Sequence, residues 1–135
     1  MLDRYIQQVQ LLPELTLADV GRYLSSKQPT DVIGYVANCM KCLLAEAVKH
    51  VHPDKGLEGI NICDVGFIFL DAHYNEYVLP LTNQPVNMLM YTFDLLDRAS
   101  EPITKQRLLT YLAEHRPELL DGLQVSDPLG KEVQA

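Results

Sequence analysis

The chain has no tryptophan, only three cysteines and no long apolar run in its 135 residues. Its longest apolar stretches, such as the one that ends in FIFL, reach about six residues, whereas a membrane-spanning helix needs about 20. The first 20 residues mix charged residues and glutamine with apolar ones, so they lack the apolar segment of a signal peptide. An odd number of cysteines without an export signal is typical of reduced thiols. We therefore expect a cytoplasmic protein that does not associate with membranes.

Sequence patterns that carry known chemistry are also absent. There is no GxSxG nucleophile motif, no HExxH zinc motif and no glycine-rich phosphate loop. Residues 71–76, DAHYNE, gather oxygen and imidazole groups, but a calcium loop would need an oxygen in place of His73 and a glycine after the cluster. Turn formation explains this segment without a metal. We predict no catalytic residues, no metal and no cofactor, although the many carboxylates and histidines leave an acid–base pair open.

The formal net charge of the chain is -7 at pH 7. Proteins bind nucleic acids largely through the phosphates, so this charge opposes such a role. The last two predicted helices, joined by ASEP, could form a helix-turn-helix, but their turn lacks the usual glycine. We therefore expect no nucleic acid partner. A recognition surface there would consist of Lys105, Gln106, Arg107, His115 and Arg116.

Apolar spacing predicts helices in the first half of the chain. Residues 2–12 carry apolar side chains at i, i+3, i+4 and i+7, the pattern of an amphipathic helix. Thr16, followed three residues later by Asp19, predicts a second helix with a capping box. A third helix is predicted over residues 30–51, with a break near Asn38 as an alternative.

The sequence changes in character after residue 59. Segments 60–71 and 76–82 are rich in β-branched and aromatic residues, which predicts an antiparallel hairpin with its turn near Tyr74 and Asn75. Pro80 predicts that the second strand lies at an edge, because proline cannot donate to a strand ladder.

Two further helices complete the predicted fold. The first begins with a polar cap and Pro85, and the second is capped by Thr104 and stopped by Pro117. We therefore expect the α+β class, with about five helices packed around a small antiparallel β-hairpin. A single domain is expected over residues 1–123, followed by a loose tail over residues 124–135. The predicted inward residues are Val86, Leu89, Met90, Phe93 and Leu96 in one helix and Leu108, Leu109 and Leu112 in the other.

The segment CMKCLLAEAVKHVHPDK, residues 39–55, combines two cysteines with two histidines. In one continuous helix, His50 would lie about 12 Å along the axis from Cys42 and about 16 Å from Cys39, too far to share a zinc ion. A redox interpretation needs a helix that begins near Asn38, so that the helix N-terminus lowers a thiol pKa, and a strand just before that helix would support it. The favoured interpretation is a core helix in which the cysteines are small apolar residues. A thiol-redox or metal-binding protein that uses Cys39 and Cys42 remains the alternative.

Acidic residues are concentrated in one part of the chain. Residues 61–101 carry six acidic residues against the single base Arg98, which accounts for -5 of the net charge of -7. A solubilising surface explains this bias, but a surface for a basic protein partner explains it as well. We therefore predict a small binding, inhibitory or regulatory module without catalysis. Its predicted partner-binding residues are Asp71, Glu76, Asp94, Asp97 and Glu101.

Overall fold

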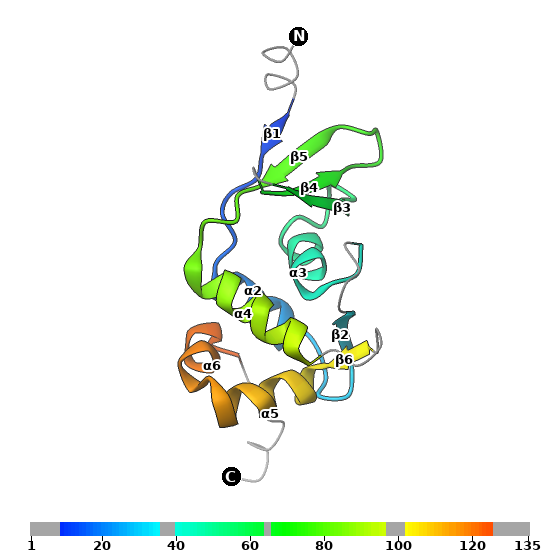
Figure 1. Ribbon diagram of the computed structural model, residues 1–135. Coiled ribbons are helices and arrows are strands. Elements are labelled where there is room, and N and C mark those ends of the chain that lie inside the picture. Colours follow the sequence, from blue (N-terminus) through cyan, green and yellow to red (C-terminus); the bar gives the residue numbers. More distant parts are fainter. Residues whose placement is uncertain (1–8, 36–39, 64–65, 97–101, 126–135) are drawn as a thin grey trace.

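The structure, a computed structural model, describes residues 9–35, 40–63, 66–96 and 102–125. These ranges contain five helices, a four-stranded sheet and a two-stranded sheet, which confirms the α+β class (Figure 1). The predicted isolated hairpin is wrong in detail, because its two strands belong to the larger sheet and a second sheet lies elsewhere.

The four-stranded sheet has the strand order β1-β5-β4-β3. The strands β3 (Glu58–Cys63), β4 (Gly66–Leu70) and β5 (Glu76–Leu79) pair antiparallel, and β4 and β5 form the predicted hairpin. Its turn includes Tyr74 with a φ of 65°, a left-handed conformation that is common in tight turns. The edge position predicted from Pro80 is wrong, since β5 lies inside the sheet and ends one residue before the proline.

The first strand of this sheet replaces part of a predicted helix. Strand β1 (Gln10–Leu11) pairs parallel with β5, and the backbone N–H of Leu12 donates to the carbonyl of Val78 at 2.8 Å. The helix predicted over residues 2–12 is therefore wrong where the structure describes it, and residues 2–8 lie outside the described ranges. The reason is non-local, because the strand is held by residues more than 60 positions further along the chain.

The two-stranded sheet contradicts the long helix predicted over residues 30–51. Strand β2 (Val32–Tyr35) pairs antiparallel with β6 (Pro102–Thr104), and helix α3 starts only at Leu43. A Cβ placed on Gly34 would lie 2.7 Å from the Leu43 backbone nitrogen, so glycine allows β2 to approach the start of α3. The proposed break at Asn38 lies outside the described residues.

Three of the helices begin at caps that agree with the sequence prediction, which named Thr16 and Thr104 and expected a polar cap shortly before Pro85. Thr16, Asn83 and Thr104 each accept a hydrogen bond from a backbone N–H three residues later, at 3.0 to 3.2 Å. Asp19 completes the predicted capping box by accepting from the Thr16 N–H. The five helices are α2 (Leu17–Ser25), α3 (Leu43–Val51), α4 (Gln84–Leu95), α5 (Lys105–His115) and α6 (Pro117–Leu123).

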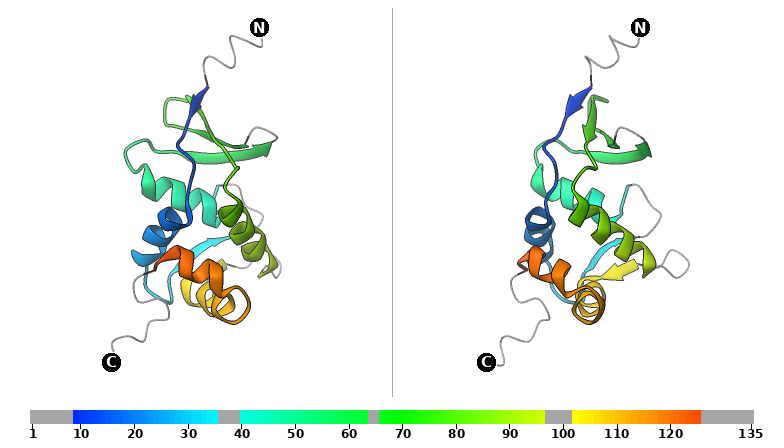
Figure 2. Two further views of the ribbon diagram at one scale, coloured as in Figure 1. Left: turned by 90° about the vertical axis from the view of Figure 1, so that its left-hand side faces the viewer. Right: turned by 60° about the vertical axis from the view of Figure 1, so that its left-hand side comes forward.

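The helices and both sheets share one apolar core. The four-stranded sheet lies at one end of the molecule, α5 and α6 lie at the other end, and α2, α3 and α4 fill the space between (Figures 1 and 2). A single cluster of buried side chains extends from Phe67 and Phe69 in β4 to Leu112 in α5. The predicted inward faces of α4 and α5 are buried as expected, with Met90 only partly so.

The predicted boundary of the tail has to be shifted. Gln124 has a φ of 53° and ends α6, and Val125, which the prediction placed in the tail, is buried against the core. Residues 126–135 lie outside the described ranges, so the rest of the predicted tail is not tested.

Candidate functional site

Cys42 is the N-cap of α3 and lies in the core. Its Sγ accepts a hydrogen bond from the Ala45 backbone N–H at 3.4 Å, and the residue is 7% exposed. The continuous core helix predicted here is wrong, since Met40 lies before α3 and is 50% exposed, but Cys42 is buried as a small apolar residue. Cys39 lies outside the described residues, so the structure does not show the two thiols together.

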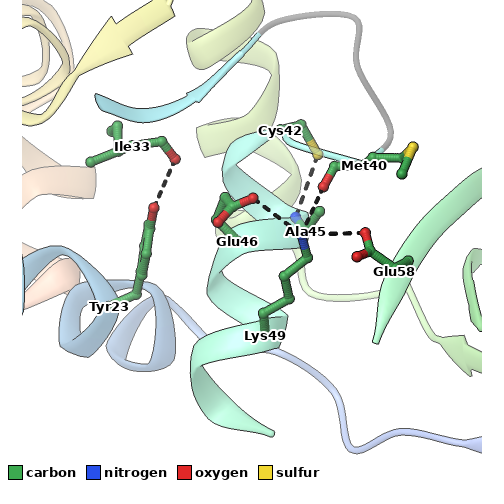
Figure 3. A network of polar contacts seen from close by, with 8 residues as sticks. All are labelled: Tyr23, Ile33, Met40, Cys42, Ala45, Glu46, Lys49 and Glu58. Carbon is green, nitrogen blue, oxygen red and sulfur yellow. Dashed lines mark hydrogen bonds and ion pairs between the residues drawn. The ribbon is translucent and has the colours of Figure 1, made fainter. Parts of the chain in front are cut away.

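The polar groups around α3 form a network without metal geometry (Figure 3). The Lys49 ammonium donates to the Met40 carbonyl at 3.1 Å and forms ion pairs with Glu46 at 3.3 Å and Glu58 at 3.5 Å. His50, at the last turn of α3, has its ring 5.8 Å from that of Tyr23. In the described ranges no three His, Cys, Asp or Glu side chains lie close enough together to hold a metal ion.

His52 is the C-cap of α3. Burial and the nearby Lys55 ammonium lower the pKa of His52, and Asp19 offsets this only in part. Both larger effects disfavour the protonated imidazole.

Asp71, one of the predicted partner-binding residues, organises the hairpin turn. Its carboxylate accepts hydrogen bonds from the backbone N–H groups of His73 and Asn75 at 2.8 and 2.9 Å, which is turn chemistry as predicted. The Asn75 amide and the Tyr77 hydroxyl also donate to it, each at 3.1 Å. Partial desolvation alone would raise the pKa of Asp71, but these hydrogen bonds outweigh it and lower the pKa to about 2.

The predicted acidic residues lie in two separate parts of the molecule. Glu76 follows the hairpin turn at the start of β5, whereas Asp94 is exposed near the end of α4. The turn and the end of α4 lie far apart in both figures of the whole molecule. Asp97 and Glu101 follow the end of α4 and lie outside the described residues, so their part in partner binding remains a prediction.

The outer face of α4 carries an apolar stripe that the prediction missed. Met88, Tyr91 and Leu95 are 41%, 67% and 49% exposed, and their spacing of three and four residues places them on one side of the helix. The signal was present in the sequence, because these three residues repeat the helical period beside the inward-facing one. Asp94 lies three residues after Tyr91, so it is exposed on the same side of α4 as the apolar stripe.

A groove of about 550 Å³ continues this stripe onto α5. Leu95 and Leu96 form its α4 side, and Arg107, Tyr111 and Glu114 are among the residues that form its α5 side. We call the stripe and groove together the α4–α5 surface: Met88, Tyr91, Asp94, Leu95, Tyr111 and Glu114.

The basic residues of the proposed helix-turn-helix have structural roles. Lys105 is 3% exposed, and its ammonium donates to the Lys27 carbonyl at 2.8 Å. Arg107 donates to the Leu96 carbonyl at 2.6 Å and so closes the end of α4. Arg116 is paired with Glu118 at 2.8 Å. These three residues therefore do not form a basic recognition face.

Comparisons of the chain with protein-family models, with curated proteins and with solved structures found no match. Among the helices of the described ranges, none has the length and apolar character needed to cross a membrane.

Proposed function

We propose that the protein is a non-catalytic binding module of the cytosol that regulates or inhibits a basic protein partner, and that it docks through the α4–α5 surface. The observation that carries the proposal is the exposed stripe of Met88, Tyr91 and Leu95 beside a groove. Tyrosine and methionine are enriched at protein interfaces, where large side chains anchor in pockets of the partner. An apolar stripe rimmed by polar residues is typical of an interaction site.

The charge around this surface supports a basic partner. Asp94 borders the stripe and Glu114 lines the groove. In the sequence, Asp97 and Glu101 follow within six residues of the last residue of α4. Like charges that repel one another in the free protein become favourable when a basic partner approaches, and they speed association in a salt-dependent way. Asp71 and Glu76, at the hairpin, would provide a second contact area for a large partner.

Capture from an extract of the source cells tests the docking surface. The immobilised wild-type protein is compared with the Tyr91→Ser/Leu95→Ser variant. As a matched control we choose Ile60→Ser/Ile62→Ser, which removes two exposed apolar side chains from the edge strand β3. We expect a partner that is retained by the wild type and the control and lost with the α4 variant. Equal retention by all three proteins would exclude α4 as the docking surface.

The purified partner then tests the role of charge. The Asp94→Lys/Asp97→Lys variant should bind more weakly than any variant changed at Cys39 or Cys42. The loss should shrink as salt rises, because the Debye length falls toward about 3 Å at 1 M. Equally tight binding by the double-lysine variant at low salt would make the acidic residues a solubilising surface only.

One observation supports a second candidate function, a thiol-redox or metal-binding role. Cys42 is the N-cap of α3 and strand β2 precedes it in the chain, although α3 starts at Leu43 and not near Asn38, where the redox hypothesis placed the helix start. Thiol titration and metal analysis of the native protein test this role. Replacing Cys39 and Cys42 with alanine should leave the metal content unchanged and alter stability by about 1 to 3 kcal/mol. Loss of a stoichiometric metal, or unusually fast thiol modification in the wild type, would favour the redox or metal function over the binding module.

A further inference from the structure

The turn between β4 and β5 lies at the end of the molecule opposite α5 and α6 (Figures 1 and 2). Tyr74 lies in this turn, and its side chain is 82% exposed, the largest exposed fraction among the large apolar side chains of the described ranges. The free energy gained from burial scales with the apolar area that is removed from water. The ring of Tyr74 therefore contributes little to the stability of its own fold.

The backbone at Tyr74 has a conformation that suits glycine better than tyrosine. Its N–H donates to the Asp71 carbonyl at 3.0 Å, and its φ is 65°. In three-residue hairpin loops of this kind the left-handed position is usually glycine, because a Cβ there crowds the following carbonyl oxygen. In the described ranges Gln124 is the other non-glycine residue with a positive φ, and it ends α6, where this conformation is common. Tyr74 thus lowers the stability of the turn without a gain from packing.

Hydrogen bonds to Asp71 hold the turn in this conformation. Its carboxylate accepts from the backbone N–H groups of His73 and Asn75, at 2.8 and 2.9 Å. The Asn75 amide and the Tyr77 hydroxyl add two more bonds, each at 3.1 Å. Tyr77 is itself buried in the core, so the turn is tied to the body of the sheet. The backbone at Tyr74 is therefore fixed before any partner arrives, which lowers the entropic cost of binding.

The chemistry of Tyr74 and Asp71 defines the site that this turn would fit. A tyrosine ring offers a large apolar contact with only two rotatable bonds, and tyrosine is enriched among the residues that dominate binding energy at interfaces. Its hydroxyl needs a hydrogen-bond partner once it is buried. The four donors to Asp71 are neutral groups, so they leave its negative charge in place, and that charge is complementary to basic residues.

We propose that Tyr74 is an anchor residue that inserts into an apolar pocket of a partner protein, with a hydrogen-bond acceptor inside the pocket and basic residues at its rim. The inference rests on the proposed function, because it needs the same basic partner, and it adds a contact away from the α4–α5 surface. It explains why a side chain that lowers the stability of the free protein is held out on a rigid turn, since residues that break a local conformational rule are concentrated at functional sites.

Photo-crosslinking in an extract of the source cells tests the anchor. The crosslinking residue p-benzoyl-phenylalanine replaces Tyr74, Tyr91 or Val32 in three separate samples. Val32 is the matched control, because it is an exposed apolar residue of the other sheet. We expect the probe at position 74 to join one protein, at a residue that lies in an apolar pocket of that protein, and the probe at position 32 not to join it.

The outcomes separate this inference from the proposed function. A specific adduct at position 91 but none at position 74 would overturn the anchor and leave the α4–α5 surface as the docking site. No specific adduct at either position would overturn both. Identical adducts at positions 74 and 32, or an adduct at position 74 outside any pocket of the joined protein, would also overturn the anchor.

Variants of Tyr74 then measure its contribution to binding of the purified partner. Asparagine adopts the left-handed conformation readily, so Tyr74→Asn should leave the melting temperature unchanged or raise it. It should weaken binding at least about 30-fold, which corresponds to about 2 kcal/mol, the value that marks a dominant interface residue. Tyr74→Phe keeps the ring and loses the hydroxyl, so it should bind with intermediate affinity.

Ile62→Asn is the control for these measurements, because it changes another exposed apolar residue of the same sheet. It should bind as tightly as the wild type. Equal affinity of Tyr74→Asn and the wild type would overturn the anchor. A melting temperature of Tyr74→Asn more than about 4 °C below that of the wild type would overturn it as well, because the ring would then stabilise its own fold.

Discussion

Gly21 marks the closest approach between α2 and the end of α6. A Cβ placed there would lie 1.6 Å from the carbonyl oxygen of Leu123. This obstacle is backbone, so no side-chain rotation can relieve it, and Gly21→Ala must push the two helices apart. We expect the free energy of unfolding to fall by about 3 kcal/mol or more, as measured by urea denaturation.

Gly122 provides the control, because it lies in α6 at the same pair of helices. A Cβ there would lie 2.6 Å from the Cδ1 atom of Leu17, which is the mobile end of a side chain. Alanine also has a higher helix propensity than glycine by about 1 kcal/mol, which offsets the adjustment of Leu17. Gly122→Ala should therefore change stability little. If Gly21→Ala and Gly122→Ala lower the free energy of unfolding by similar amounts, the close contact at Gly21 does not limit the packing of α2 against α6.

Asp71 makes stability depend on pH in an acidic window. Its pKa is about 2 in the folded protein, against 3.8 for an ordinary aspartate. A depressed pKa means that the ionised side chain contributes stability above about pH 4, and that this contribution is lost as the pH falls toward 2. The Asp71→Asn variant should be less stable than the wild type at pH 5, and the difference should shrink by pH 2. Urea midpoints at several pH values measure this, and a constant difference would contradict the role of the ionised carboxylate.

Local signals in the sequence predicted the starts of α2, α4 and α5, and non-local contacts explain the errors in β1 and β2. The caps at Thr16, Asn83 and Thr104 depend on residues within one helical turn, so the sequence alone reveals them. Strands β1 and β2 instead pair with β5 and β6, more than 60 residues away, and no local pattern shows such partners. For β2 the apolar spacing favoured a helix, although its β-branched residues and Gly34 are more typical of a strand.

For the candidate site, too, the sequence predicted local features but not the distances between separate parts of the chain. The turn role of Asp71 follows from local chemistry, and the structure shows it. The distance between the hairpin and the end of α4 depends on how the whole chain folds, so the sequence could not separate Asp71 from Asp94. The groove between α4 and α5 collects residues from two helices, and only the fold brings them together.

Helix α4 has an inward and an outward apolar face, and substitutions should distinguish them. Phe93 is fully buried in the core, whereas Tyr91 is mostly exposed on the other side. Phe93→Ala should reduce the free energy of unfolding by about 3 to 5 kcal/mol, while Tyr91→Ala should change it by less than about 0.5 kcal/mol. Urea denaturation measures both values. If Tyr91→Ala is the more destabilising change, the outer stripe serves packing and not partner binding.

The molecule as a whole combines two sheets and five helices within the described residues, but its buried side chains form one cluster. That cluster joins Phe69, in the sheet at one end, to Leu112, in α5 at the other end. A shared core predicts that both ends unfold together, since neither can lose its packing without exposing apolar surface of the other.

Calorimetry tests this expectation with one variant at each end. Phe69→Ala and Leu112→Ala each leave a cavity that costs about 2 to 5 kcal/mol. For a chain of this length, a loss of 1 kcal/mol lowers the melting temperature by roughly 2 to 8 °C. Each variant should therefore shift one common transition, with equal calorimetric and van't Hoff enthalpies. Two separate transitions, of which Phe69→Ala moves one and Leu112→Ala the other, would show that the sheet and the helical end fold as independent units.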